Sequence, residues 1–349
     1  MEKKQITDWL RTEDETLLNE LWHMADETRK LNVGDDVHLR GLLEISNICA
    51  RDCQYCGLRV GNKGLERYRM PEDEIMECVH EAVSYRYGTV VLQAGEDYGI
   101  TKDWIANLIR RIKSETSLAV TLSLGERTDE EYREWKEAGA DRYLLRFETS
   151  NRDLYNRIHP PVKGSDSNRI ETLRLLKSMG YEAGSGVMIG IPGQTYDDLA
   201  KDILLFKELD LDMIGVGPYI PHHETPLGQN DEKLFALEGR QVPNTEAMTY
   251  KVIALARLVC PSANIPSTTA LATLNTNSGR ELGLSRGANI VMPNMTPRKY
   301  RSMYEIYPAK ACIDETAADC RACMHRRIIS IGRTVGSGRG DSPNKKSAA

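Results

Sequence analysis

Short apolar runs alternate with longer amphipathic stretches after residue 36, and this alternation constrains the fold more than any other feature of the sequence. Eight apolar runs have the length of buried strands: 41–46, 89–93, 118–124, 142–147, 182–191, 213–219, 264–269 and 288–292. Seven stretches have the apolar spacing of helices: 72–86, 102–115, 129–138, 167–179, 196–208, 245–259 and 278–286. Strands that alternate with helices form a parallel sheet, and eight such units match a (β/α)8 barrel of about 250 residues. The sequence therefore predicts an α/β protein with a TIM-type barrel, and a six-stranded open barrel with an appended unit is the alternative.

The segments that flank the barrel complete the predicted organisation. Residues 1–36 have a polar, helical pattern, and residues 37–300 carry the barrel. Residues 301–331 form a C-terminal extension that contains a second group of cysteines. Residues 332–349 are rich in glycine, serine, lysine and arginine and have almost no apolar side chain, so we expect this tail to be disordered.

Composition excludes several classes of function. Among 349 residues, 51 are acidic and 46 are lysine or arginine, so the net charge of −5 argues against nucleic acid as a partner. No apolar run approaches the roughly 18–20 residues of a membrane span, and the N-terminus lacks the apolar core of a signal peptide. We therefore expect a cytoplasmic protein with no membrane partner. Thiols stay reduced there, so the eight cysteines are better explained as metal ligands or catalysts than as disulfides.

A group of three cysteines follows the first predicted strand, at the end of a barrel where chemistry takes place. Cys49, Cys53 and Cys56 have the spacing C-x3-C-x2-C. Three thiolates on one short loop can bind a soft metal centre, and three rather than four leave one iron of a 4Fe-4S cluster free for another ligand. Zinc would require a fourth ligand nearby, but the nearest histidines, His38 and His80, are outside the loop. The sequence therefore predicts a 4Fe-4S cluster here.

Polar side chains follow other predicted strands. The period of two puts Arg146 and Glu148 on one strand face, pointing into the barrel mouth, where a buried charge must be paired or bind a ligand. The same period puts Thr121 and Ser123 on one face. Gly190 lies in a G-I-P-G turn that lets the backbone approach a flat ligand, or that simply leads into the next helix.

The first cysteine motif, with Tyr55 before its last cysteine, resembles the radical S-adenosylmethionine (SAM) superfamily. Four further phrases resemble the HydE family of that superfamily, the maturases of FeFe hydrogenase: LQAGED at 92–97, TLSLGE at 121–126, VGPYIPH at 216–222 and GANIVMPN at 287–294. The resemblance implies a (β/α)8 barrel around a closed cavity, in which the cluster cleaves SAM to a 5′-deoxyadenosyl radical. It implies a substrate that is a small iron complex with CO, cyanide and cysteinate ligands, processed for assembly of the diiron subcluster.

The resemblance also implies functions for individual residues. The residues expected to bind SAM are Glu148, Arg169, Thr121, Ser123, Met188 and Gly190. The residues expected to line the substrate cavity are Arg146, Thr268, Thr269 and Met292. We expect a ferredoxin or flavodoxin as the reductant and other hydrogenase maturases as further partners.

A second group of cysteines, Cys312, Cys320 and Cys323, has the spacing C-x7-C-x2-C in the C-terminal extension. It resembles the accessory cluster site of some HydE proteins. Three alternatives stay open at this stage: a second iron–sulfur cluster of the 2Fe-2S or 4Fe-4S type, a zinc ion that also binds His325, or no metal.

Two departures from the family pattern favour alternative functions. Phe147 and Ala94 stand where the pattern has histidine and serine, which leaves open a divergent HydE-like or methylornithine-synthase-like enzyme that acts on another small molecule. A biotin synthase would need further cysteines on its strands, whereas Cys78 and Cys260 fall in helical patterns and are expected to pack in the core. A non-catalytic iron–sulfur scaffold is the second alternative, because a fold does not determine a function.

Overall fold

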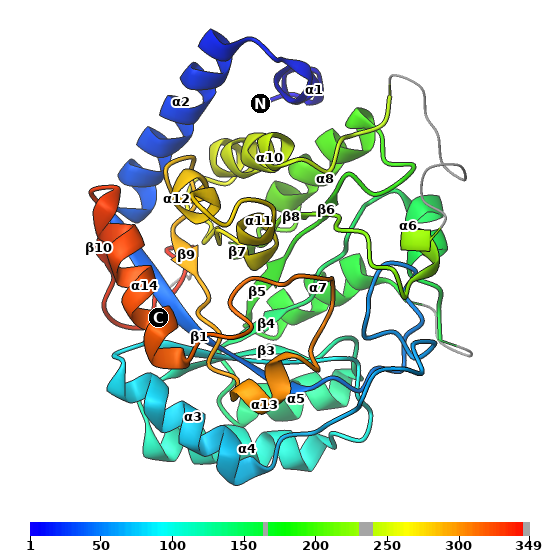
Figure 1. Cartoon of the computed structure of the whole chain (residues 1–349), viewed down its shortest axis with the longest axis vertical. Helices are drawn as coiled ribbons and strands as arrows, with labels where there is room; N and C mark the ends of the chain where they lie inside the picture. Colours follow the sequence, from blue (N-terminus) through cyan, green and yellow to red (C-terminus); the bar gives the residue numbers. More distant parts are fainter. Residues whose placement is uncertain (163–166, 230–239, 345–349) are drawn as a thin grey trace.

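The computed structural model describes residues 1–162, 167–229 and 240–344, and its centre is a sheet of parallel strands (Figure 1). The strands of this sheet are β1 (Asp36–Ser46), β2 (Thr89–Ala94), β3 (Ala119–Ser123), β4 (Arg142–Leu144), β5 (Glu182–Ser185), β7 (Met213–Ile214), β9 (Ile290–Val291) and β10 (Thr334–Val335). Hydrogen bonds connect β1 through β2, β3, β4 and β5 to β7 in order, and β9 and β10 both pair with β1. Isolated parallel bridges join Met213 to Asn264 and Pro266 to Ile290. These bridges complete a ring of eight positions, so the predicted (β/α)8 barrel is confirmed.

Helices surround the ring in the positions that the sequence predicts (Figure 1). The helices between strands are α3 (Glu72–Ser84), α4 (Lys102–Glu115), α5 (Asp129–Glu137), α6 (Arg152–Ile158), α7 (Arg169–Ser178), α8 (Tyr196–Glu208), α10 (Glu246–Val259), α11 (Thr269–Leu274) and α12 (Gly279–Leu284). Side-chain caps fix several of their starts. Thr128 and Glu131 form a capping box at α5, and Thr195 and Asp198 form another at α8. Short α6 and α11 lack a long apolar period and were not predicted.

Two predicted strands are interrupted. Residues 182–191 form β5 and a separate β6 (Met188–Ile189), and residues 213–219 form β7 and a separate β8 (Gly217–Pro218). β6 pairs with β8 in a two-stranded ladder of its own. At the break, a Cβ on Gly186 would overlap the carbonyl group of Gly215, so only glycine allows the two chains to approach this closely. The break separates the β6–β8 ladder from the main ring of strands and places this ladder beside the barrel mouth.

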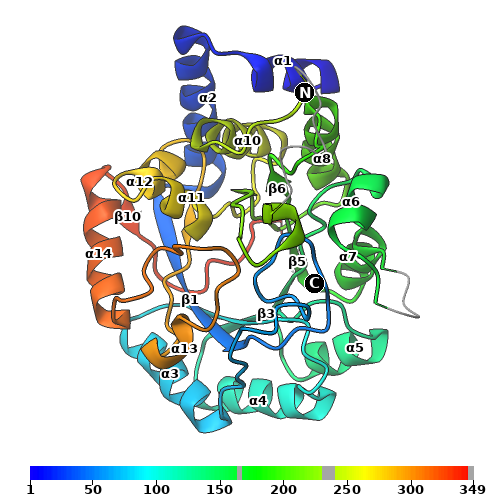
Figure 2. The same ribbon diagram turned by 45° about the vertical axis from the view of Figure 1, so that its right-hand side comes forward.

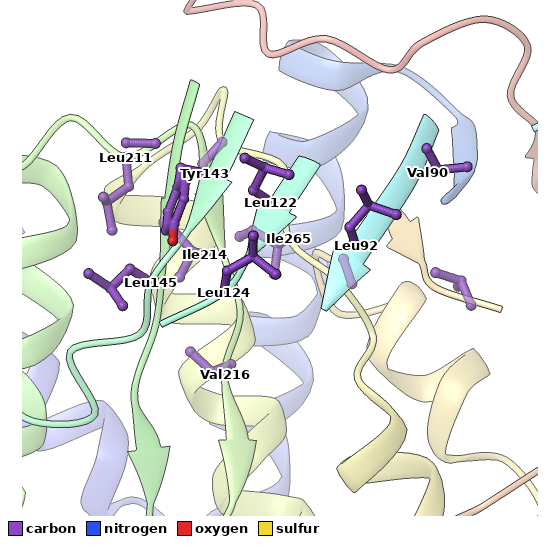
Figure 3. Packing of buried hydrophobic residues seen from close by; sticks show 14 of the residues in the cluster. Val90, Leu92, Leu122, Leu124, Tyr143, Leu145, Leu211, Ile214, Val216 and Ile265 are labelled. Atoms are coloured by element: carbon purple, nitrogen blue, oxygen red, sulfur yellow. The ribbon is translucent and has the colours of Figure 1, made fainter. Parts of the chain in front are cut away.

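Alternation along the strands divides apolar side chains from polar ones. Leu122 of β3 and Leu124, which follows β3, lie in the hydrophobic layer outside the ring, together with Tyr143 and Leu145 (Figure 3). Each fully buried side chain of this kind stabilises the fold by about 1.5–3 kcal/mol. Thr121 and Ser123 alternate with the leucines and face the barrel interior, as the period of two requires.

The N-terminal helices α1 (Lys3–Arg11) and α2 (Glu15–Val33) pack against α8 and α10 at one end of the molecule (Figure 2). Lys251 of α10 fastens them, because its buried ammonium group donates to the carbonyl oxygens of Leu10 and Thr12 and pairs with Glu13. Among the helices of the described residues, none combines the length and apolarity needed to span a membrane.

The C-terminal region follows α13 (Arg298–Arg301) and includes α14 (Ala317–Ser330) and β10. The prediction of a disordered tail is wrong for residues 332–344, because β10 pairs with β1 and the following residues close the barrel floor. Arg40 donates to the carbonyl oxygen of Gly340 over 2.9 Å, and Arg142 pairs with Asp341. Charged residues of β1 and β4 hold the tail in place, rather than burial of apolar side chains. The hydrophobicity of the sequence therefore did not predict that the tail is ordered. Residues 345–349 lie outside the described part of the chain.

Candidate active site

A cavity of about 360 Å³ opens at the carboxyl ends of the strands. Cys49, Cys53 and Cys56 all line it, as predicted from their position after β1. Glu148 and Arg169 line the same cavity; Glu148 lies in the segment after β4, and Arg169 begins α7. The structure therefore brings together the cysteines and the charged residues that the sequence placed in one site.

Backbone hydrogen bonds from several elements fix the cysteine loop. The amide of Ala50 donates to the carbonyl oxygen of Glu96 over 2.9 Å, and the amide of Gln54 donates to that of Ile158 over 2.8 Å. The amide of Gly57 donates to the carbonyl oxygen of Ile306 over 3.1 Å. A Cβ on Gly57 would overlap the carbonyl oxygen of Glu305, so glycine is required where the C-terminal segment crosses the loop.

The three thiols fit a polynuclear centre better than a single ion. A zinc ion with Zn–S bonds of 2.3 Å would hold its sulfur ligands only about 3.8 Å apart. Among the described residues, Cys49, Cys53 and Cys56 do not form a group whose ligand atoms all lie within 4.8 Å of one another. At least one pair of their sulfur atoms is therefore farther apart than a single zinc ion would hold them. Burial raises the pKa of Cys49 and raises that of Cys56 to about 12, so the metal-free thiols are protonated. A 4Fe-4S cluster, with iron and sulfide between the thiolates, fits both the spacing and the cavity.

Arg146 and Glu148 form an ion pair on the cavity wall, with 3.0 Å between Nη2 and Oε2. Both residues line the cavity, as expected, but β4 ends at Leu144, so their position does not follow from strand alternation. Glu148 has a left-handed backbone with φ of 61°, although it is not a glycine. Backbone strain of this kind costs about 1–3 kcal/mol and is concentrated at functional sites. The strained backbone presents the Glu148 carboxylate to the cavity.

The Arg169 guanidinium group is held from three sides. Its Nε donates to Glu126 over 2.8 Å, its Nη1 donates to the carbonyl oxygen of Arg146 over 2.8 Å, and its Nη2 donates to His159 Nε2 over 2.7 Å. Burial, together with the charges of Arg169 and Arg51, lowers the pKa of His159 to about 2. His159 is therefore neutral and can accept from Arg169. These contacts orient a permanent positive charge beside the cysteines.

A second buried ion pair lies behind the cysteine loop. Arg51 Nε donates to Glu96 over 2.6 Å, and Arg51 also lies 3.2 Å from Glu126. Both Arg51 and Glu96 are 2% exposed at their side chains, so they are paired out of contact with solvent. The pairs around Glu96 and Glu126 connect Arg51 with Arg169 and make the wall beside the cluster site rigid.

Most of the other predicted site residues also line the cavity. These residues are Ser123, Met188, Thr268, Thr269 and Met292. Thr121 does not line it: Thr121 is 1% exposed and borders a smaller space at the barrel floor with Arg40 and Arg142. Gly190 does not line it either, and its amide donates to the side chain of Gln194 over 2.8 Å. The prediction that Thr121 and Gly190 lie in the SAM site therefore has no support in the geometry.

Several cavity residues were not predicted from the sequence. The C-terminal segment contributes Tyr304, Tyr307 and Lys310, and the ammonium group of Lys310 pairs with Glu44 of β1. Lys310 and Glu44 have side-chain exposures of 5% and 1%. His159 lies beyond α6 with no motif around it. The sequence did not indicate Lys310 or His159 as cavity residues, because each reaches the cavity at the end of a long connecting segment.

The two departures from the family pattern have different positions. Phe147 points away from the cavity and packs against Phe206, with 5.8 Å between ring centroids. Ala94 does line the cavity. Of the two, only Ala94 therefore alters the surface that a bound molecule meets.

The second cysteine group is brought together only in part. Ligand atoms of Cys312, Glu315 and Cys320 lie within 4.8 Å of one another, and neither Cys323 nor His325 belongs to this group. A hydrogen bond from the Cys320 thiol lowers the pKa of Cys312. Cys323 Sγ instead accepts from Arg327 Nε over 3.4 Å. Cys78 is buried in α3, as predicted for a packing residue.

Comparison with known proteins agrees with the cysteine loop and the barrel. The sequence profile of the radical SAM superfamily matches residues 43–206. The FeFe hydrogenase maturase subunit HydE of Thermotoga maritima is 47% identical over 316 residues, which cover 90% of this chain and 86% of that protein. The chain therefore belongs to the radical SAM superfamily of enzymes. Within that superfamily, it is a member of the HydE family of FeFe hydrogenase maturases.

More distant relatives share the fold. The 3-methylornithine synthase of Methanosarcina acetivorans is 28% identical over 284 residues, which cover 81% of this chain and 76% of that protein. A crystal structure of methylornithine synthase superposes with a TM-score of 0.80 at 23% identity, covering 96% of this chain and 94% of that one. This similarity supports the barrel architecture alone.

Proposed function

We propose that the cavity binds a 4Fe-4S cluster through Cys49, Cys53 and Cys56, together with SAM and a small organometallic substrate. The observation that carries this proposal is the convergence of three cysteines and an oriented pair of opposite charges, Glu148 and Arg169, on one cavity. The cluster supplies one-electron cleavage of SAM to a 5′-deoxyadenosyl radical. The chain itself binds and orients the reactants and excludes water.

The charged residues are suited to the two ends of the methionine part of SAM. Glu148 presents a carboxylate that attracts an ammonium group, and Arg169 presents a guanidinium group that attracts a carboxylate. Arg169 is already oriented by Glu126 and His159, so little side-chain freedom is lost when a ligand binds. Ser123 and Met188 line the same cavity and would contact the remainder of the molecule.

The deeper part of the cavity suits a compact iron complex with CO, cyanide and cysteinate ligands. Met292 and Leu42 provide apolar surface, which suits CO. The Thr268 hydroxyl already accepts from the amide of Leu271, and its own proton is free to bind an anionic ligand such as cyanide. Arg146 adds a positive charge that would attract the complex as a whole.

A segment of the C-terminal region covers part of this cavity. Residues 303–310 contribute Tyr304, Tyr307 and Lys310 to the cavity wall. Asn47 binds the carbonyl oxygen of Met303 over 2.7 Å, which fastens one end of the segment to the cysteine loop. A closed chamber protects a reactive radical from side reactions.

The proposal is tested by quantifying 5′-deoxyadenosine after anaerobic reconstitution with iron and sulfide and addition of dithionite and SAM. We expect formation of the nucleoside that is lost in Cys56→Ala and kept in Cys260→Ala, because Cys260 lies at the end of α10, away from the cavity. The cysteinate–iron complex should accelerate SAM cleavage. If SAM binds beside an intact cluster but no deoxyadenosine forms, with or without that complex, the chain is instead an iron–sulfur scaffold.

A methylornithine-synthase-like reaction is the second candidate, because Ala94 changes the cavity wall. An amino-acid substrate would need a carboxylate for its ammonium group. The cavity carboxylates Glu44 and Glu96 each have a cationic partner, and Glu148 is assigned to SAM, which favours the organometallic substrate. Acceleration of SAM cleavage by an amino acid rather than by the iron complex would favour the second candidate.

Partners and compartment follow from the chemistry. One-electron reduction of the cluster calls for a low-potential carrier, and we propose a ferredoxin or flavodoxin. Transfer of the product calls for other hydrogenase maturases as partners. We propose a cytoplasmic location, where the eight cysteines stay reduced and available to metals.

A further inference from the structure

The guanidinium group of Arg67 binds the backbone of the cysteine loop. Its Nη1 donates to the carbonyl oxygens of Asn47 over 2.7 Å and Leu58 over 2.8 Å. Its Nη2 donates to the carbonyl oxygens of Arg59 over 2.8 Å and Asn62 over 3.1 Å. One of these acceptors precedes the three cysteines in the chain, and the other three follow them. A single side chain therefore ties the start of the cysteine loop to its end.

The chain on either side of Arg67 is itself fixed. Asn47 donates through Nδ2 to the carbonyl oxygen of Glu66 over 2.7 Å, and its Oδ1 accepts from the amide of Tyr68 over 2.8 Å. Asn47 is fully buried, and the ring of Tyr68 stacks on Tyr300 with 4.6 Å between centroids. The neighbours of Arg67 in the chain therefore direct its side chain at the loop.

The charge of Arg67 differs from the charges of other arginines near the cysteines. Arg51 pairs with Glu96 over 2.6 Å, and Arg169 pairs with Glu126 over 2.8 Å. Among the described residues, no carboxylate forms an ion pair with Arg67, whose acceptors are the four carbonyl oxygens. A carbonyl oxygen carries only a partial negative charge, so the full charge of Arg67 remains available to a negative group nearby.

The negative groups that Arg67 reaches are cysteines of the loop. Burial lowers the pKa of Arg67, and the charges of Cys49 and Cys56 act in the opposite direction. Burial raises the pKa of Cys56, and Arg67 acts against that rise by favouring the thiolate. The potential of an iron–sulfur cluster depends on the net charge around it. Reduction adds one negative charge to a cluster, so a nearby cation without a carboxylate partner favours the reduced form.

We propose that Arg67 is a positioning residue for the cluster: it holds the cysteine loop in its metal-binding shape and makes the bound cluster easier to reduce. The inference rests on the proposed function, which puts a 4Fe-4S cluster at Cys49, Cys53 and Cys56. The four hydrogen bonds account for the first effect, and the unpaired charge accounts for the second. Arg67 does not line the cavity, so it has no contact with SAM or substrate.

The first test measures the midpoint potential of the reconstituted cluster, without SAM, by a redox titration followed by electron paramagnetic resonance. Arg67→Gln removes the charge and keeps a donor amide. At a fixed solution potential, its ratio of reduced to oxidised cluster should fall about tenfold, which is about 59 mV for a one-electron couple. Arg67→Lys keeps the charge, so its ratio should stay within about twofold of the parent.

Lys63→Gln is the matched control for the potential. It removes the same charge from an exposed position in the same loop, where solvent and salt screen it. Its ratio of reduced to oxidised cluster should therefore stay within about twofold of the parent.

The second test uses the metal-free protein and does not depend on the cluster. The amide of Val60 donates to the carbonyl oxygen of Arg51 over 2.8 Å, so its hydrogen exchange reports opening of the loop. Arg67→Gln should speed this exchange by at least about tenfold, the effect of losing one hydrogen bond from a charged donor. Lys63→Gln should leave it unchanged. Exchange in the buried helix α10 checks that each variant keeps its fold.

Three outcomes overturn the proposal. A midpoint potential in Arg67→Gln that equals that of Lys63→Gln would show that the charge of Arg67 does not act on the cluster. Equal shifts in Arg67→Gln and Arg67→Lys would show that the charge is not the cause. Unchanged exchange at Val60 would show that the hydrogen bonds do not hold the loop.

Two further results keep the test decisive. If Arg67→Gln takes up no cluster, Arg67→Lys decides: the parent potential there supports the proposal, and a potential lowered by about 59 mV contradicts it. If the parent protein itself takes up no iron and sulfide, the proposed function fails and the effect on the potential fails with it. The exchange of Val60 then still decides whether Arg67 holds the loop.

Discussion

The two cysteine groups look alike in the sequence and differ in the structure. Cys49, Cys53 and Cys56 lie on an irregular loop, and all three line one cavity. Of the second group, Cys320 and Cys323 lie on α14, and only Cys320 converges with Cys312. An irregular loop can turn each side chain toward a common centre, whereas a helix fixes residues three apart at about 5–6 Å between Cβ atoms along its surface.

The residues that surround the two cysteine groups also differ. The first loop lies near Glu96 after β2, Glu148 after β4 and Arg169 at the start of α7, so its cluster would lie beside groups that bind a cofactor. The second group contacts helix α12 through Arg280 and Arg327. The comparison teaches that cysteine spacing predicts a metal centre only together with the conformation of the chain between the cysteines.

The largest expected effect separates the two groups by their part in SAM cleavage. Cys53→Ser should reduce deoxyadenosine formation by at least about 10³-fold, the size of loss that follows removal of one member of a catalytic unit. Cys323→Ser should leave the rate within about twofold, a change of less than 0.5 kcal/mol in the barrier. Iron content and the dithionite-dependent rate are measured for both. Equal losses in the two variants would show that the groups act as one centre.

Much of the fold could be predicted because apolar strands alternate with amphipathic helices. The period of two led to the expectation that Arg146 and Glu148 face the cavity, and both line it, although β4 ends before them at Leu144. The period of two predicted which face of β3 carries Thr121, but not how deep in the barrel Thr121 lies. The structure puts Thr121 at the barrel floor rather than beside Ser123 in the cavity. Depth depends on the stagger between strands, which a single strand sequence does not contain.

Contacts between distant polar residues were beyond the sequence. Lys310 reaches Glu44, which lies 266 residues earlier in the chain, and the ordered tail depends on Arg40 and Arg142. Pairs of this kind have no local period or spacing. The cysteine loop could be predicted because all of its ligands lie within one short segment, whereas the approach of Glu315 to Cys312 and Cys320 depends on the turn before α14.

The second expected effect concerns the segment that joins the two cysteine groups. Lys310→Met leaves the buried carboxylate of Glu44 without its partner and should lower the free energy of unfolding by about 3–5 kcal/mol. The double variant Glu44→Leu/Lys310→Met removes both charges and should recover a large part of that loss. Urea unfolding of the metal-free protein measures all three forms. A single variant as stable as the parent would show that the pair does not connect β1 with the C-terminal segment.

The third effect compares histidines beside the two groups across pH. The pKa of His159 is about 2 in the folded protein, against about 6.5 when unfolded, so the unfolded state binds the extra proton between these values. Stability is therefore complete above about pH 6.5 and falls below it by about 1.4 kcal/mol per pH unit. His159→Gln should remove this slope. Urea unfolding at pH 7.5, 6.5 and 5.5 on the metal-free protein measures it.

His325→Gln is the matched variant in the second region. Burial also lowers the pKa of His325, but this histidine is only partly buried, so its contribution to the slope should be smaller. An identical change of slope in both variants would mean that the two histidines have similar surroundings. That result would contradict the structure, in which His159 lies in the rigid cavity wall and His325 lies on the outer face of α14.

The smallest expected effect tests whether metal binding at the second cysteine group stabilises the segment that lines the cavity. Cys312 follows Lys310 by two residues, and the amide of Ala311 between them donates to Thr273 over 3.1 Å. An ion bound at Cys312 should therefore restrain the segment 303–312. Removing the metal from the second cysteine group with a chelator should speed amide hydrogen exchange there by about tenfold, or about 1.4 kcal/mol of local opening free energy, with little change at the cysteine loop 49–56. Unchanged exchange in 303–312 would show that the second site stabilises only α14, and the two cysteine groups would then be independent of each other.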